Sequence, residues 1–367
     1  MSISIPPAQR PARCDLDRFG RVWAVLPWGM MAAAAVAAVG LASVVGPDWS
    51  EPVAAWPFLL SAVVLGMPHG ALDLRLALRV NKRWNRRAAL ATGYLAIAGI
   101  SFALLWLLPL VAIAAFGVLT VMHFGAADAR DGAMIAGHRP PRGGPLWVTA
   151  AGRGTFFLSL PFAWDPGGAM LPVEVALQLV GAEGVAYADV AVRSGGTVAA
   201  GVGLLAVVAG VVLTWQRAAR AHPAEHGNVT GSDAADSQTG DFSPNNEKLL
   251  TTHIGELAVL AVAASMLEPM FFVGLYFLGW HSVRHLRRAA VLSGDAAGRP
   301  VRTFVRQHLW SLPLLLPTLA VYAVIGHAWI GWADPMSWAV LLLLAFVVLT
   351  PPHHLLVERA IQVCREP

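Results

Sequence analysis

The chain has 367 residues, of which 56% are hydrophobic and only 13% are charged, and its mean hydropathy is +0.59. A typical soluble domain carries about 25% charged residues, so this chain has too few polar groups to cover a water-facing surface. The composition indicates an integral membrane protein and excludes a disordered chain. Two cysteines, Cys14 and Cys364, lie near opposite ends of the chain, so the sequence offers neither a disulfide framework nor a CxxC metal site.

Apolar segments recur along the chain at the length of about 20 residues that crosses a bilayer. We expect an all-α transmembrane bundle of about ten spans, within a range of roughly eight to eleven. The expected spans are 21–41, 56–75, 88–108, 110–124, 146–162, 198–215, 249–266, 270–286, 309–330 and 337–357. The weaker segment 172–192 contains three acidic residues, and we expect it to be interfacial or re-entrant.

The positions of the basic residues predict the orientation of these spans, because Lys and Arg concentrate in cytoplasmic loops. With the N-terminus inside, all but two of the 26 Lys and Arg residues fall on the inner side, and the exceptions are Arg153 and Arg193. We therefore expect both termini in the cytoplasm, a cytoplasmic tail at 1–20, and one catalytic membrane domain at 21–367 with a flexible polar cytoplasmic loop at 221–246. This topology explains the net charge of +4 without nucleic-acid binding and places the protein in the cell membrane.

Histidines inside the expected spans are candidate functional residues, because ionisable side chains are costly to bury in a membrane. His69, His123, His281 and His285 lie near the ends of outside-to-inside spans, and so at one depth toward the cytoplasmic leaflet. His281 and His285 are four residues apart and share a helix face. The sequence predicts a metal site formed by these four histidines, whose imidazoles suit iron, copper, nickel or zinc.

Three carboxylates lie where they could support such a site. Asp73 follows His69 by four residues and is positioned to accept a ring N–H, and Asp128 is placed similarly relative to His123. Glu256 lies near the start of its span and is a candidate outer carboxylate.

A proline–histidine element ends the last expected span, with His353 and His354 at the same depth as the other histidines. Adjacent residues point to different faces of a helix, so we expect at most one of the two to face the bundle. That histidine, with His353 as the candidate, is expected to line the pocket or to support a ligand. Glycines beside the motifs would permit close helix approach: these are Gly66, Gly70, Gly125 and Gly279.

Four short motifs occur in order between residues 66 and 354. They are GMPHGALD at 66–73, HFG at 123–125, WHSVRH at 280–285 and PPHH at 351–354. On these residues the sequence resembles the Brp/Blh family of membrane β-carotene 15,15′-dioxygenases.

The resemblance implies an iron(II)-dependent enzyme that cleaves β-carotene at its central double bond with dioxygen and yields two molecules of all-trans-retinal. It assigns the four histidines named above as the iron ligands. β-Carotene is a hydrocarbon that dissolves in the bilayer, so apolar and aromatic walls are expected to bind it. The aromatic residues expected to line the tunnel are Phe124, Tyr276, Phe277 and Trp280.

Two other classes fit part of the pattern. A di-iron membrane hydroxylase or desaturase also places histidines at cytoplasmic helix ends, although it needs about eight of them with HxxHH clusters. A haem-binding membrane electron carrier is the alternative outside the oxygenases, because paired histidines in spans can ligate haem axially.

Overall fold

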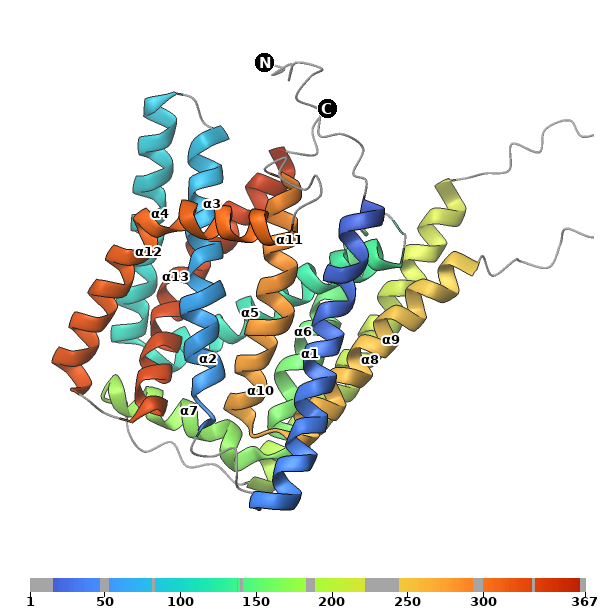
Figure 1. Ribbon diagram of the computed structural model, residues 1–367, viewed down its shortest axis with the longest axis horizontal. Coiled ribbons are helices and arrows are strands. Elements are labelled where there is room, and N and C mark those ends of the chain that lie inside the picture. The colour runs from blue at the N-terminus through green and yellow to red at the C-terminus, as the bar shows by residue number, and fades with distance from the viewer. Residues whose placement is uncertain are drawn as a thin grey trace, which may run out of the picture.

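The computed structural model describes residues 16–46, 53–80, 83–136, 138, 141–182, 189–221, 244–292, 300–331 and 334–363. Within these ranges the regular elements are all helices, which confirms the expected all-α class. They are α1 (Leu16–Val45), α2 (Trp56–Ser61), the π-helix η3 (Ala62–Gly66), α3 (Met67–Val80), α4 (Trp84–Leu107), α5 (Pro109–Ile135), α6 (Gly144–Trp164), α7 (Pro166–Leu179), α8 (Asp189–Ala221), α9 (Pro244–Met266), α10 (Pro269–Leu275), the π-helix η4 (Tyr276–His281), α11 (Ser282–Leu292), α12 (Pro300–Ile330) and α13 (Pro335–Val363). Figure 1 shows one bundle of long helices, with α7 lying across one end.

Seven of the described helices are long and apolar enough to cross a membrane, rather than the expected ten. They are Leu26–Val45, Trp84–Leu107, Pro109–Ile135, Ala191–Gln216, Glu247–Met266, Phe304–Ile330 and Pro335–Leu355. Two expected spans, 56–75 and 270–286, are interrupted by the π-helices, and a third forms α6 with Arg153 among its apolar residues. The cytoplasmic position of the termini stays a prediction, and most of the 221–246 loop lies outside the described residues.

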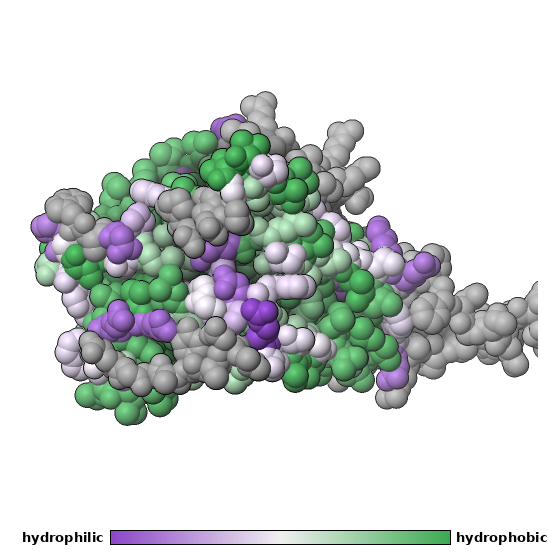
Figure 2. Space-filling model, turned by 90° about the horizontal axis from the view of Figure 1, so that it is seen from below, coloured by the Kyte–Doolittle hydropathy of each residue, from purple (hydrophilic) through white to green (hydrophobic). Residues whose placement is uncertain are grey.

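The burial of the spanning helices separates a central set from a peripheral set. In α5, α9 and α13, 39% of the most apolar 18-residue stretch of the helix is buried inside the protein, compared with 6% in α4 and 17% in α12. The outward faces of the peripheral helices carry large apolar side chains, such as Leu95, Ile100 and Val324. Figure 2 looks onto the α7 end of the bundle, where broad apolar areas are interrupted by scattered polar residues. Such outward apolar faces suit a lipid environment.

Helices α5 and α6 cross in direct backbone contact. A Cβ atom on Gly125 of α5 would collide with the carbonyl group of Ala150, and one on Gly154 of α6 would collide with that of Val121. The close approach expected at Gly125 is therefore confirmed. Because His123 lies two residues before this contact, the crossing fixes where its helix can place the ring.

Three of the arginines that the orientation argument counted on the inner side are buried in helices. Arg130 of α5 is 5% exposed, and in α11 Arg284 is 1% and Arg287 is 5% exposed. Helices α5 and α11 extend past the expected apolar segments, and these side chains lie within the bundle.

Candidate functional site

Both π-helices lie directly beside sequence motifs at the candidate site. η3 ends at Gly66, where the first motif begins, η4 ends at His281, and the two π-helices contact each other. Single π turns are rare and frequently occur at functional sites. One local signal was available in the sequence: Pro68 has no N–H, so the carbonyl of Val64 loses its i+4 donor. The ring of His308 from α12 lies at 2.5 Å from that oxygen.

Five histidine rings from α5, η4, α11 and α13 pack together, with His123 at the centre. The centroid of its ring lies 5.4 Å from that of His281, 5.5 Å from that of His353 and 5.1 Å from that of His354. His285 joins the group at 6.3 Å from His281 and 6.0 Å from His353. The Nδ1 atoms of His123 and His354 are 2.9 Å apart, a hydrogen-bond distance at which one nitrogen donates and the other accepts. The structure thus brings together three of the four histidines predicted as ligands.

The fourth predicted ligand, His69, lies in α3, but its side chain and that of Asp73 lie outside the described part of the structure. Its neighbours Gly66, Met67 and Gly70 line the same pocket as the other histidines.

The expectation that at most one of His353 and His354 faces the bundle was wrong. Both rings contact the ring of His123. Successive residues are about 100° apart around a helix, so two adjacent side chains can flank a single direction. On α13 that direction points toward α5.

The donor chemistry of the cluster fits a metal such as iron, because neutral imidazoles suit late first-row ions. Two imidazoles on one ion, with metal–nitrogen distances of about 2.1 Å, have ring centroids roughly 5 Å apart. The 5.4 Å between His123 and His281 is close to that spacing. Among the described side chains, which do not include that of His69, no three His, Cys, Asp or Glu residues form a group that could hold a metal ion. The four-histidine metal site therefore stays a prediction.

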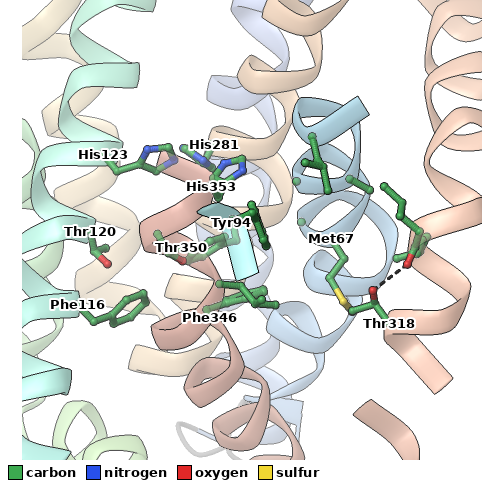
Figure 3. Close-up of a pocket in the computed structure, with 18 of the residues that line it drawn as sticks. Met67, Tyr94, Phe116, Thr120, His123, His281, Thr318, Phe346, Thr350 and His353 are labelled. Atoms are coloured by element: carbon green, nitrogen blue, oxygen red, sulfur yellow. Dashed lines mark hydrogen bonds between the residues drawn. The ribbon is translucent and has the colours of Figure 1, made fainter. Parts of the chain in front are cut away.

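An apolar pocket of about 230 Å³ begins at the histidines (Figure 3). His123, His281 and His353 point toward one another at one end of it, and mostly apolar side chains line the rest. The larger apolar side chains of its walls include Met67, Phe116, Phe124, Phe277, Phe346 and Leu349. Two of the aromatic residues expected in the tunnel, Phe124 and Phe277, line this pocket, and their ring centroids are 5.0 Å apart.

The other two expected tunnel residues, Tyr276 and Trp280, are fully buried behind the pocket wall. The hydroxyl of Tyr276 and the indole N–H of Trp280 donate to Oδ2 of Asp128, at 3.0 and 3.1 Å. Placing them in the tunnel was wrong, because a buried tyrosine or tryptophan needs a partner for its polar atom, and here that partner lies away from the pocket.

Asp128 belongs to a buried group of charges that the sequence did not reveal. Arg284 donates to Oδ1 of Asp128 at 3.2 Å and to Oε1 of Glu256 at 2.5 Å. Arg153 donates to Oε2 of Glu256, and its Nη1 lies 2.6 Å from Nδ1 of His253. Two guanidinium groups thus balance two carboxylates, and all four residues are at most 3% exposed.

This arrangement corrects two expected roles. Every described contact of Asp128 is made with the charge network or its aromatic donors, and none with His123. Glu256 pairs with Arg153 and Arg284 rather than with the histidine cluster. The signal in the sequence was Arg153, a basic residue within an apolar segment, which requires a buried anionic partner.

Comparison with known proteins agrees with this geometry. The profile of the β-carotene 15,15′-dioxygenase family matches residues 60–359, a range that includes all the histidines of the cluster. A probable β-carotene 15,15′-dioxygenase, Blh, from Halobacterium salinarum is 29% identical over 341 residues, which cover 87% of this chain and 88% of the relative. No solved structure gives a significant match. The histidine motifs and the extent of the profile match lead to one conclusion: the chain belongs to the β-carotene 15,15′-dioxygenase family.

Proposed function

We propose that this protein cleaves β-carotene at its 15,15′ double bond with dioxygen and releases two molecules of all-trans-retinal. The observation that carries the proposal is an imidazole cluster at one end of an apolar pocket, within a helix bundle of this family. The family description and the name of the Halobacterium relative support the substrate and the bond that is cleaved.

We further propose that iron(II) is held by His69, His123, His281 and His285. The mutual packing of three of these rings and their nitrogen-only donor chemistry support the assignment. When bound, the iron would supply the activation of dioxygen. The side chains of the protein fix the ring orientations, because the Nδ1 atom of His123 is engaged by His354 and leaves Nε2 for the metal.

The pocket walls select and orient the substrate. β-Carotene has no hydrogen-bonding group, so its affinity comes from removing apolar surface from contact with water and from packing against side chains. Phe124 and Phe277 lie beside the histidines and set how closely a polyene can approach them. The apolar outer faces of α4 and α12, which both contribute to the pocket, suit entry of the substrate from the bilayer of the cell membrane.

The test is to express the chain in cells that accumulate β-carotene and to analyse their extracted pigments. Loss of β-carotene with the appearance of retinal supports central cleavage, whereas shorter or longer apocarotenals indicate another bond. Unchanged β-carotene in cells that contain the iron-loaded protein contradicts the proposal.

The ligand assignment is tested by replacing single histidines. We expect His69→Ala, His123→Ala and His281→Ala to lose bound iron and cleavage while the protein still inserts into the membrane. His327→Ala is the matched control, because this histidine lies on the exposed face of α12 away from the pocket. Retention of iron and activity in the first three variants contradicts the four-histidine site.

A further inference from the structure

Two threonines place hydroxyl groups in the otherwise apolar part of the pocket, close to the histidines. Thr120 precedes His123 by three residues on α5, and Thr350 precedes His353 by three residues on α13. Residues three apart are neighbours on one helix face, so each threonine lies one turn from a histidine of the cluster. Figure 3 shows both threonines beside the pocket, next to the histidine end.

These two hydroxyls have no hydrogen-bond partner within the described part of the protein. A threonine within a helix commonly bonds back to the carbonyl four residues earlier. Thr318, the third threonine of the pocket, does so and donates to the carbonyl of Leu314 at 2.7 Å. Thr120 and Thr350 lack this bond, although Thr120 is only 6% exposed. Both hydroxyls are therefore available to a molecule in the pocket.

A hydrocarbon substrate cannot use these hydroxyls, whereas its products can. A polar group that faces an apolar ligand without a hydrogen-bond partner costs free energy, so two such hydroxyls in a site built for β-carotene alone would weaken binding. Central cleavage replaces one carbon–carbon double bond with two carbonyl groups at the point that faced the histidines. The hydroxyls lie one helical turn from that point.

We propose that Thr120 and Thr350 form a binding subsite for aldehydes and donate hydrogen bonds to the carbonyl oxygens of the two product molecules. The inference rests on the proposed function, since it takes the products to be aldehydes formed in this pocket. These two hydrogen bonds increase the affinity of the pocket for the products relative to the substrate, because the substrate cannot form them. Retention of retinal after cleavage, and inhibition by retinal, follow from the same contacts.

The test compares two ligands with one carbon skeleton in the purified full-length protein. Binding of all-trans-retinal and of its deoxygenated hydrocarbon is measured by quenching of tryptophan fluorescence in detergent micelles. Valine has the shape of threonine without the hydroxyl. We expect Thr120→Val and Thr350→Val each to raise the Kd for retinal about two- to tenfold, the effect of one hydrogen bond, and to leave the Kd for the hydrocarbon unchanged.

Two further variants separate hydrogen bonding from packing. Thr318→Val is the matched control, because its hydroxyl is already bonded to Leu314, and it should change neither Kd. Thr120→Ser keeps a hydroxyl and should retain most of the affinity for retinal. Unchanged retinal binding in both valine variants, or an equal loss for both ligands, overturns the inference. Cleavage of β-carotene by the wild-type protein is measured separately. If the protein cleaves β-carotene, the proposed function stands whatever the binding result. If it does not, the proposed function and the aldehyde subsite both fail.

Discussion

Replacing Asp128 with asparagine tests whether the buried charges hold the histidine-bearing helices together. Asp128 lies on α5, five residues after His123, and accepts hydrogen bonds from Tyr276, Trp280 and Arg284. Asparagine has nearly the same size, but it removes the negative charge and one of the two acceptor oxygens. The variant therefore changes the electrostatics of the network with little change in packing volume.

The loss of stability expected for Asp128→Asn follows from the balance of charges in this network. In the wild-type protein two guanidinium groups face two carboxylates, and Asp128 is 3% exposed, so solvent screens the interaction weakly. Without Asp128, Glu256 alone balances Arg153 and Arg284. Removing one partner of a buried pair leaves an uncompensated charge and costs about 3–5 kcal/mol. We expect Asp128→Asn to lower the free energy of unfolding by about this amount.

The assay is equilibrium unfolding of the purified protein in mixed micelles with increasing SDS, followed by circular dichroism. Asp334→Asn is a matched control, because Asp334 is an exposed cap of α13. Asparagine caps a helix about as well as aspartate, so only the interaction of the charge with the helix dipole is lost, at a cost of about 0.3–1 kcal/mol. The double variant Asp128→Asn/Arg284→Gln restores the balance of charge and should recover about 0.5–3 kcal/mol relative to additive losses. A cost for Asp128→Asn no larger than that of the control, or strict additivity in the double variant, would refute the electrostatic account.

Three other outcomes are expected. Gly125→Ala should prevent stable folding, because the new methyl group collides with the carbonyl of Ala150, whereas Gly117→Ala, which meets nothing within 4 Å, should fold normally by circular dichroism. His354→Phe keeps a ring but removes the nitrogen that engages His123, so metal titration should show iron affinity reduced about 10–100-fold; unchanged affinity would contradict that role. Dialysis against a chelator should abolish cleavage without loss of helical signal, and iron(II) should restore it; persistent activity in metal-free protein would exclude an iron enzyme.

The histidine cluster was predictable from the sequence, whereas its surroundings were not. Histidines within apolar segments stand out because burial in a membrane is costly, and similar depth in spans that run in the same direction predicted that His123 and His281 would meet. The contact of both His353 and His354 with His123 depends on how α13 is rotated about its axis. The rotation of a helix is set by packing against neighbours, which an apolar pattern on all faces does not encode.

The helix interruptions and the charge network escaped prediction for a related reason. An apolar segment such as 270–286 satisfies the length rule for a span, and nothing in its composition marks the π-helix that begins at Tyr276. Arg284 follows the apolar part of this segment and resembles a loop residue at a membrane surface. Only its partners on α5 and α9 make it a buried residue, and these are more than twenty residues away in the chain.

The segment from η4 into α11 connects the pocket to the charge network through two adjacent rows of side chains. Phe277 and His281 lie four residues apart and face the pocket. The second row has the same spacing of four residues and consists of Tyr276, Trp280 and Arg284. All three side chains donate hydrogen bonds to Asp128 on α5. Because neighbouring rows on one helix rotate together, hydrogen bonds that fix the second row also fix the direction of the first. A charge network outside the pocket therefore determines how precisely His281 is aimed, and loosening it should weaken metal binding before it disrupts the fold.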